Sequence, residues 1–329
     1  MTNHILEFQY ADDCGLVAHT PHALQRSLDV IAGFYEALGL KMNVNKTEIL
    51  IQRQNPEEQH FTFHINGDEI KQVTSFKYLG SILSDKHNID EEVCNRINQA
   101  SVAFGKLRTR VFQNDNLRLD TKIAVYTAVC ITSLLYGAET WTVYRRHMKQ
   151  LEAFHIKSLQ RILKLTWRDK IPHAEILQRA NTTTIETMIS RKQLRWTGHV
   201  IRMSEDRLPR QILYGQLLHG HRRQGGPMKR FKDQVKASLK KCDIDSETLE
   251  VNASDRSIWR TMCKEGLSHL EQSIYDEREA RRQRRHNPPA QQPNNDNNDN
   301  RIECPLCGRM CASRIGLHSH LRWHSRQPP

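Results

Sequence analysis

The sequence contains no apolar run long enough to span a membrane and no leader of the secretory type. Its most apolar stretch, residues 123–136, is too short and too often interrupted by threonine to cross a bilayer. The residues after Met1 are polar and lack the charged and apolar segments of an export signal. We therefore expect an intracellular protein, nuclear and cytoplasmic, that lies in a reducing compartment and engages no membrane.

The cysteines do not have the pattern of a disulfide framework. Five of the eight are scattered between Cys14 and Cys263, and the other three, Cys304, Cys307 and Cys311, lie within the last thirty residues. Such crowding is typical of metal ligands. No cysteine has a recognisable nucleophile context, which argues against a thiol protease, and no glycine-rich phosphate-binding loop is present.

Acidic residues are fewer than basic ones. The 49 Lys and Arg residues outnumber the 37 Asp and Glu residues, which gives a formal net charge of +12. An excess of this size modestly favours a polyanionic binding partner, and nucleic acid is the leading candidate. With 329 residues and 38% apolar content, the chain can bury the core of one or two domains.

Residues 1–85 have the pattern of an α+β region. Short apolar segments between residues 5 and 18 flank the polar tip Tyr10-Ala11-Asp12-Asp13 and predict a hairpin that presents two carboxylates. Thr20 as N-cap, with Pro21 in the first position, predicts a helix that ends at Gly39. Further strands are expected at residues 44–51, 61–65 and 76–83, with a tight turn at Asn66-Gly67 after the second.

The rest of the chain divides into three parts. Between residues 86 and 285 the apolar residues recur at helical spacing, which predicts a mainly α-helical region. Residues 286–300 are rich in Asn, Pro and Gln without a large apolar side chain, so we expect a disordered linker. Residues 301–329 form a separate small module. The expected fold class is therefore α+β, with a small ββα unit at the end.

The last module has the ligand spacing of a C2H2 zinc finger. Cys304, Cys307, His320 and His324 fit the pattern C-x2-C-x12-H-x3-H, which places two thiolates on a hairpin and two imidazoles one helical turn apart around Zn2+. Ile302 and Leu317 occupy the positions of the small core, whereas Cys311 replaces the usual bulky aromatic residue. A thinner core depends more on the metal for folding. The alternative is that zinc merely folds a module that contacts nothing.

The helix of this module has few residues suited to reading bases. Counting back from His320 places Ser313, Gly316 and Ser319 at the three positions from which such fingers contact bases. Two serines and a glycine are poor base readers. The basic side chains of the module can still reach phosphates, and they are Arg309, Arg314, Arg322 and Arg326. We therefore expect this module to bind nucleic acid through its phosphates, without sequence specificity.

The two aspartates near the start belong to a longer series of motifs. Taken alone, an Asp pair at a hairpin tip is more often ordinary turn chemistry. Here FQYADD is followed by a helix and then by GLKMNVNKTEIL, FKYLGSIL, LLYGAETWT, LRWTGHVIRM, RQGGPMKRFKD and CPLCGRMCASRIGLHSHLRWH. This series resembles the C-terminal part of non-LTR (LINE-type) retrotransposon endonuclease/reverse transcriptases over nearly the whole chain. It implies a partial polymerase palm, then a helical thumb and C-terminal region, then the zinc finger.

The resemblance also implies roles for individual residues. Asp12 and Asp13 would bind Mg2+ in the intact polymerase. The residues near the primer or the incoming nucleotide would be Tyr10, Lys46, Tyr78, Leu79 and Gly80, and the helices after Ile89 would act as the thumb.

Two adjacent aspartates are not sufficient for polymerisation. Two Mg2+ ions bridge the attacking hydroxyl and the triphosphate, and clustered carboxylates must hold them. The family takes a further essential Asp from an earlier palm strand, which has no counterpart before Met1. We therefore expect a fragment of an RNA-directed DNA polymerase that binds RNA and DNA, largely through phosphates, without autonomous synthesis. The alternative is a zinc-finger nucleic-acid-binding or protein-interaction module with no enzymatic role.

Three further segments have two interpretations each. One set of side chains could line a nucleic-acid surface or pack in the core, and it consists of Arg195, Trp196, His199 and Arg202. A basic loop could contact phosphates or be solvated, and its cationic residues are Arg222, Arg223, Lys229 and Arg230. Residues 278–285 are suited to a nuclear-localisation signal or to the exposed end of a helix.

Overall fold

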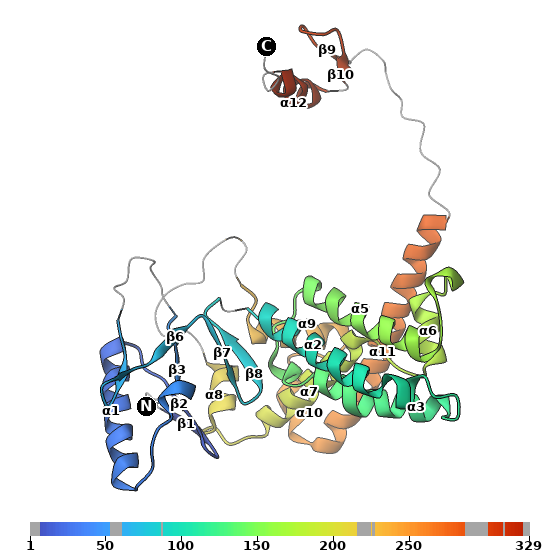
Figure 1. Ribbon diagram of the computed structural model, residues 1–329. Coiled ribbons are helices and arrows are strands. Elements are labelled where there is room, and N and C mark those ends of the chain that lie inside the picture. Colours follow the sequence, from blue (N-terminus) through green and yellow to red (C-terminus); the bar gives the residue numbers. More distant parts are fainter. Residues whose placement is uncertain are drawn as a thin grey trace. The chain divides into compact units, whose positions relative to one another are not determined.

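The computed structural model describes residues 7–52, 61–86, 88–215, 225, 228–286, 302–311 and 313–324 (Figure 1). The chain divides into two compact units, residues 1–275 and residues 276–329. Helices predominate, and the strands of the described part form small two-stranded sheets, so the fold is a mixture of α and β as expected from the sequence. No described helix combines the length and the apolar character needed to cross a bilayer.

The first described elements are the predicted hairpin and helix. Strands β1 (Glu7–Tyr10) and β2 (Asp13–Leu16) pair antiparallel, with Tyr10 opposite Asp13. Helix α1 (Pro21–Ala37) begins where the sequence predicts, because the Thr20 side chain accepts a hydrogen bond from the Ala23 backbone N–H at 3.2 Å. Both local predictions are confirmed.

The strand expected over residues 44–51 is shorter than predicted. Residues Val44–Lys46 form the 3-10 turn η1, and only Glu48–Leu50 form a strand, β3. The physical reason is Asn43, whose side-chain oxygen accepts from the Lys46 N–H at 3.2 Å and starts the turn in place of a strand. Strand β3 pairs in parallel with β6 (Lys71–Val73), a pairing that local patterns do not predict.

Two further hairpins follow. Strands β4 (His64–Ile65) and β5 (Asp68–Glu69) turn at Asn66-Gly67, with φ of 50° and 92°, as the dipeptide predicts. Strands β7 (Ser75–Tyr78) and β8 (Ser81–Ser84) turn at Leu79-Gly80, again with both φ positive. A small core lies between α1 and these strands, and its buried members are Leu28, Ala32, Ile49, Phe63, Ile65 and Ile70.

The helical region begins at α2 (Asp90–Leu107). It continues through η2 (Arg108–Phe112), α3 (Leu119–Val125), η3 (Tyr126–Ile131), α4 (Thr132–Leu134), η4 (Ala138–Thr140), α5 (Arg145–Ile162), η5 (Trp167–Asp169) and α6 (His173–Arg179). The segments η2 and η3 are π-helical, so the helix expected over residues 123–136 contains a π-helical stretch. These helices enclose the largest buried core of the described residues, in which Tyr126, Leu134 and Leu159 are at most 1% exposed.

A second helical core surrounds α7 (Ile185–Ile201). The other helices of this part are α8 (Leu208–Tyr214), α9 (Phe231–Lys241), α10 (Leu249–Ser254) and α11 (Arg256–His286). Trp259 of α11 donates from Nε1 to the Leu194 carbonyl oxygen at 3.1 Å. A Cβ added to Gly198 would lie 2.1 Å from the Trp259 ring, so the glycine of the LRWTGHVIRM motif allows this close approach.

The C-terminal unit contains the end of α11, from Asp276 on, and then two short strands and a helix. Strands β9 (Ile302–Glu303) and β10 (Met310–Cys311) pair antiparallel, and α12 (Arg314–His324) follows them. Residues 287–300, most of the predicted linker, lie outside the described residues. The palm, thumb and finger divisions at residues 85, 285 and 300 remain predictions.

Candidate metal centre

Two cysteines and two histidines of the C-terminal unit converge on one point. Cys304 follows β9, Cys307 lies in the turn before β10, and His320 and His324 lie one turn apart on α12. One ligand atom from each of the four lies within 4.8 Å of the others. This is the only group of three or more His, Cys, Asp or Glu side chains with such geometry among the described residues. The four side chains could hold a metal ion.

The distances between the ligand atoms suit a tetrahedral ion. The Cys307 Sγ lies 3.1 Å from the His320 Nε2 and 3.2 Å from the His324 Nε2, and the two Nε2 atoms are 3.2 Å apart. Zinc with bonds of about 2.3 Å to sulfur and about 2.0 Å to nitrogen separates its ligand atoms by roughly 3.3–3.8 Å. These three ligand atoms therefore lie at nearly tetrahedral separations, and Cys304, whose Sγ lies within 4.8 Å of them, completes the set by moving closer by at most about 1 Å.

The turn between the two cysteines is held by the backbone. The Gly308 N–H donates to the Cys304 carbonyl oxygen, and the Cys304 N–H donates to the Arg309 carbonyl oxygen, both at 2.9 Å. Gly308 has φ of +71°, a conformation that costs a glycine little. These contacts bring both sulfurs to the same side of the hairpin.

The electrostatic surroundings favour the protonation states that bind metal. Burial opposes ionisation of Cys304, but hydrogen bonds from the backbone N–H groups of Leu306 and Cys307 outweigh it, so the pKa of the Cys304 thiol lies below its usual value. Burial, followed by the charges of His324 and Arg309, lowers the pKa of His320. Metal binding requires thiolate and neutral imidazole, and both shifts act in that direction.

The apolar core beside these ligands is thin, as the sequence predicts. Ile302 and Leu317 are only half-buried, and Cys311 is buried opposite Ile302. Trp323 adds an aromatic contact, because its ring stacks on His320 with centroids 5.9 Å apart. The described side chains of the unit therefore bury little apolar surface apart from the ligands.

The surface of α12 is basic and lacks long base-reading side chains. Ser313 caps the helix, since its Oγ accepts from the Gly316 N–H at 3.1 Å. Gly316 and Ser319 are exposed but offer no side chain longer than a hydroxyl group. Between residues 302 and 324 the exposed arginines are Arg309, Arg314 and Arg322, whereas Arg326 lies outside the described residues.

The YADD hairpin is exposed and lies against the second motif hairpin. Asp12 and Asp13 are exposed, and Tyr10 is 67% exposed. The Tyr78 hydroxyl donates to the Phe8 carbonyl oxygen at 3.4 Å, which brings β7 against β1 across 70 residues of sequence. No third acidic, His or Cys side chain groups with the two aspartates among the described residues. Lys46, in η1, is exposed.

The Leu79-Gly80 tip is fixed by the helical region. The Tyr136 hydroxyl donates to the Leu79 carbonyl oxygen at 3.1 Å, and the Arg96 guanidinium donates to the Gly80 carbonyl oxygen. The same guanidinium lies 4.5 Å from the centre of the Tyr136 ring. The motifs FKYLGSIL and LLYGAETWT therefore meet in space, with strand β8 beside α2 (Figure 1).

A buried ion pair completes this junction. Glu92 accepts from Arg96 Nε at 2.6 Å and from the Ile82 N–H at 2.7 Å. The Arg96 and Glu92 side chains are 5% and 3% exposed. Sequence reasoning missed Glu92, Arg96 and the hydroxyl contact of Tyr136. The available signal was the placement of Glu92 and Arg96 at i and i+4 on an otherwise amphipathic helix.

Two cationic residues of the basic loop that was predicted to contact phosphates bind other residues of the chain. Lys229 is half-buried, and its Nζ donates to the Val143 carbonyl oxygen at 3.4 Å and to the Gln234 side chain. Burial lowers its pKa. Arg230 is exposed and paired with Asp233 at 3.4 Å. Arg222 and Arg223 lie outside the described residues.

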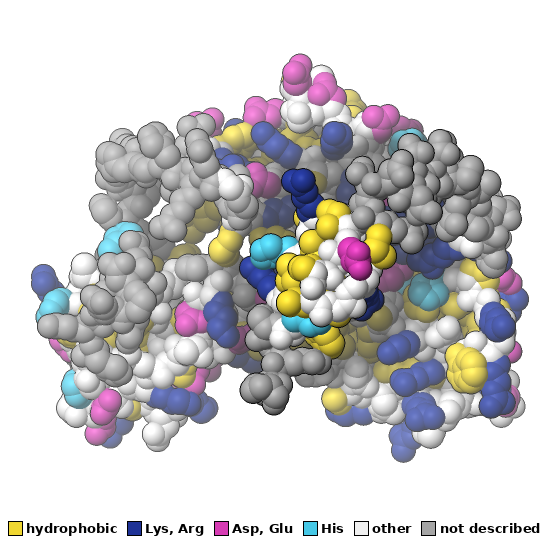
Figure 2. Space-filling view, turned by 90° about the horizontal axis from the view of Figure 1, so that it is seen from above, with side chains coloured by type: hydrophobic (Ala, Val, Ile, Leu, Met, Phe, Trp, Pro, Cys, Tyr) yellow, Lys and Arg dark blue, Asp and Glu magenta, His cyan; other side chains and the backbone are white. Residues whose placement is uncertain are grey.

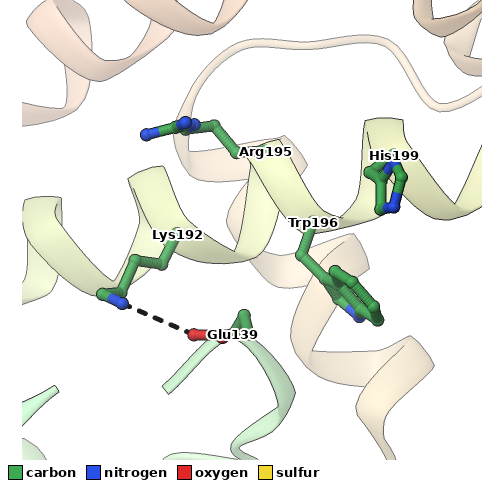
Figure 3. Close-up of a pocket in the computed structure, with 5 residues that line it drawn as sticks. All are labelled: Glu139, Lys192, Arg195, Trp196 and His199. Atoms are coloured by element: carbon green, nitrogen blue, oxygen red, sulfur yellow. Dashed lines mark ion pairs between the residues drawn. The ribbon is translucent and has the colours of Figure 1, made fainter. Parts of the chain in front are cut away.

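The LRWTGHVIRM block contains four residues that could either line a nucleic-acid surface or pack in the core. Three of these four line an open pocket. Arg195, Trp196 and His199 share this pocket with Lys192 and Glu139 (Figure 3). The fourth, Arg202, instead donates to the Ala253 carbonyl oxygen at 2.6 Å.

Basic side chains are not confined to these sites. On the face shown in Figure 2, Lys and Arg lie across much of the surface, with Asp and Glu between them at several places. On this face the basic side chains do not gather in a single patch. No family model, curated protein or solved structure matches the chain.

Proposed function

We propose that this chain is a zinc-binding, nucleic-acid-binding protein related to the C-terminal part of non-LTR retrotransposon reverse transcriptases. The observation that carries the proposal is the convergence of Cys304, Cys307, His320 and His324 within 4.8 Å. Thiolate and imidazole ligands in tetrahedral arrangement select zinc over hard cations such as magnesium. All four positions are filled by protein atoms, as in structural zinc sites, so the ion would stabilise the unit rather than perform catalysis.

The surface of α12 supports nucleic acid as the partner. Arg314 and Arg322 are exposed on the helix and Arg309 is exposed in the hairpin. Arginine side chains bind phosphates through charge-assisted hydrogen bonds. Because Ser313 is used in capping and Gly316 has no side chain, the helix has little means of reading sequence. The unit would therefore hold the phosphate backbone irrespective of base sequence.

The relation to reverse transcriptases is supported by the contacts between motifs. The FQYADD hairpin touches the FKYLGSIL hairpin through Tyr78, and the latter is held by Tyr136 of LLYGAETWT. The resemblance requires the first two motifs near one primer terminus, and their contact agrees with that requirement. Asp12 and Asp13 alone do not fit a site for two Mg2+ ions, so we assign them no catalytic step in this chain.

This chain by itself is expected to give no template-dependent primer extension with Mg2+ or Mn2+. Two adjacent carboxylates without a third ligand cannot hold two metal ions against the triphosphate. The measurement is primer extension on RNA and DNA templates, with a reverse transcriptase as positive control. Incorporation that is present in the wild type and lost in Asp12→Asn would show that the site is complete.

Binding to duplex DNA is expected to weaken steeply with salt and to depend little on sequence. Counterion release predicts that log K falls by roughly 0.9 per phosphate contacted for each unit of log salt. Arg314→Ala and Arg322→Ala should each flatten this slope by about one unit if each side chain makes one phosphate contact. Arg118→Ala, at a position whose side chain is 86% exposed in the other unit, is the matched control and should leave the slope unchanged.

The same salt titration distinguishes the proposed nucleic-acid-binding function from the alternative, a module that binds protein. The C-terminal unit also exposes apolar side chains, with Ile315 84% and Leu306 66% exposed, which would suit a protein partner. A chain that uses this unit only for protein contacts would bind no duplex DNA at low salt. Strong preference for one duplex sequence would instead identify a base-reading unit, because a good bidentate base contact is worth roughly 1–3 kcal/mol at one position.

A further inference from the structure

An open pocket of about 330 Å³ lies between α7 and η4. Its side chains are Glu139, Lys192, Arg195, Trp196 and His199 (Figure 3). Four of the five share one face of α7, because positions i, i+3, i+4 and i+7 of a helix lie together. Its volume falls at the lower end of the range for small-ligand sites, which is roughly 300–1,000 Å³.

The opposite face of α7 packs in the protein core. Leu194, Thr197 and Gly198 are buried, and Gly198 lies against Trp259. Trp196 is only half-buried, although it belongs to the same motif. The packing role of this motif therefore falls to its glycine and leucine, which leaves the indole of Trp196 in the pocket.

The pocket combines an aromatic surface with cationic groups. The Trp196 and His199 rings have centroids 5.6 Å apart and are inclined at 53°. Lys192 and Arg195 line the same pocket, and Arg195 makes no hydrogen bond or ion pair with any described residue. Aromatic faces stack on bases of any sequence, and adjacent cations hold the phosphates between them.

Glu139 adds a carboxylate to the lining of the pocket. Its side chain is 35% exposed, and its Oε2 atom, which is itself buried, forms an ion pair with the Lys192 ammonium group at 3.5 Å. Figure 3 shows Glu139 between Lys192 and Trp196, with Arg195 pointing away from it. A carboxylate at this end repels phosphate and favours a ligand group that carries N–H or O–H. The base amino group or the ribose hydroxyl of a nucleotide meets that condition.

We propose that this pocket binds one unpaired nucleotide of a single-stranded nucleic acid. The base stacks on Trp196, an amino or hydroxyl hydrogen is donated to Glu139, and a flanking phosphate lies at Arg195. This assignment rests on the proposed function, since it gives the nucleic-acid-binding chain a second contact apart from the C-terminal unit. A base inside a duplex is already stacked on both faces, so the pocket selects unpaired strands.

The test uses the full chain, a fluorescent oligocytidylate as RNA or DNA, and fluorescence anisotropy. Trp196→Ala is expected to weaken single-strand binding about 5- to 150-fold, which corresponds to the loss of one stacked base. Trp196→Phe should retain most of the affinity. The matched control is Trp167→Ala, because Trp167 is 80% exposed and also has an arginine, Arg168, over its ring at 5.6 Å. This control should bind as the wild type does.

Two further ligands separate stacking from loss of folding. An oligomer of abasic sugar phosphates has nothing to stack, so the wild type and Trp196→Ala should bind it equally. Duplex binding, which uses the C-terminal unit, should also be unchanged in Trp196→Ala. A variant that weakens all three ligands together would overturn the stacking assignment, as would a Trp196→Ala variant indistinguishable from Trp167→Ala.

The outcomes for this pocket and for the proposed function are distinct. If the wild type binds no nucleic acid at low salt, the proposed function fails and this inference fails with it. If the wild type binds duplex and single strand but Trp196→Ala does so equally well, only the pocket assignment fails. Comparison of RNA with DNA identifies the donor to Glu139. Tighter RNA binding that is lost in Glu139→Ala assigns the ribose hydroxyl, and equal binding of RNA and DNA that Glu139→Ala weakens alike assigns the base amino group. A Glu139→Ala variant that binds both as the wild type does would overturn the role of Glu139.

Discussion

Chelation of zinc is expected to unfold residues 302–324 while the helices of residues 90–275 stay folded. The C-terminal unit has two strands of two residues each and a thin core, so it cannot bury enough apolar surface to fold unaided. Structural zinc binding in such peptides supplies about 10–16 kcal/mol at neutral pH, nearly all of the folding free energy. We expect protection of the α12 amides from hydrogen exchange to be lost in chelator and restored by zinc. Helix α5 provides the internal reference.

Ligand replacement should have the same effect as chelation. Cys307→Ser removes one of the four ligands and should abolish stoichiometric zinc retention together with α12 protection. Cys94→Ser is the matched control, because Cys94 is an exposed cysteine of α2 outside the metal group. Protection of α12 that persists in chelator, or one tightly held zinc ion in Cys307→Ser, would show that the unit does not fold around this centre.

Arg96→Ala is expected to destabilise the unit of residues 1–275 by about 3–5 kcal/mol. The substitution leaves the Glu92 carboxylate buried without its cation, and it removes the donor to the Gly80 carbonyl oxygen. The matched control is Arg179→Ala. Arg179 forms an i,i+4 pair with Glu175 at 2.6 Å, but both side chains are more than 40% exposed, so the loss should be at most about 1 kcal/mol. Urea unfolding followed by circular dichroism measures both.

A double variant tests whether an unpaired charge causes this loss. Glu92→Gln combined with Arg96→Met removes both charges and should be less destabilising than Arg96→Ala alone, because no carboxylate is left unpaired in the protein interior. Equal losses for Arg96→Ala and Arg179→Ala would mean that the buried pair does not hold the Leu79-Gly80 tip in the way described.

Features that depend on neighbouring residues could be predicted from the sequence. The Thr20 cap followed by Pro21, and the turn at Asn66-Gly67, act through hydrogen bonds and φ preferences within a few residues. The metal ligands belong to the same class, since a turn and one helix place all four. These signals do not require knowledge of the tertiary fold.

Contacts between distant segments could not be predicted in the same way. Arg96 meets Gly80 across 16 residues and Tyr136 meets Leu79 across 57 residues. In the sequence, Arg96 is one polar residue among many on an amphipathic helix. Lys229 is a similar case, because a basic loop suggests a solvated cation whereas its ammonium group donates to Val143. The role of such a side chain depends on the group that it contacts, and only the tertiary fold determines which group that is.

The Trp196 pocket could be predicted from the sequence only in part. The sequence identifies Trp196 and His199 as either surface or core residues, and the periodicity of α7 does not choose between them. Burial of Gly198 against Trp259 fixes which face of the helix points inward. The contribution of Glu139 comes from η4, a segment that precedes α7 by more than forty residues, and no local pattern connects the two.

The most direct test of the proposed function is the affinity of the full chain for duplex DNA with and without an intact metal centre. Wild type and Cys307→Ser would be titrated across a range of salt concentrations, with Cys94→Ser as control. We expect Cys307→Ser to bind more weakly and its salt slope to be smaller by roughly two to three units, one for each phosphate contact of Arg309, Arg314 and Arg322. Equal affinity and equal slope in wild type and Cys307→Ser would contradict it.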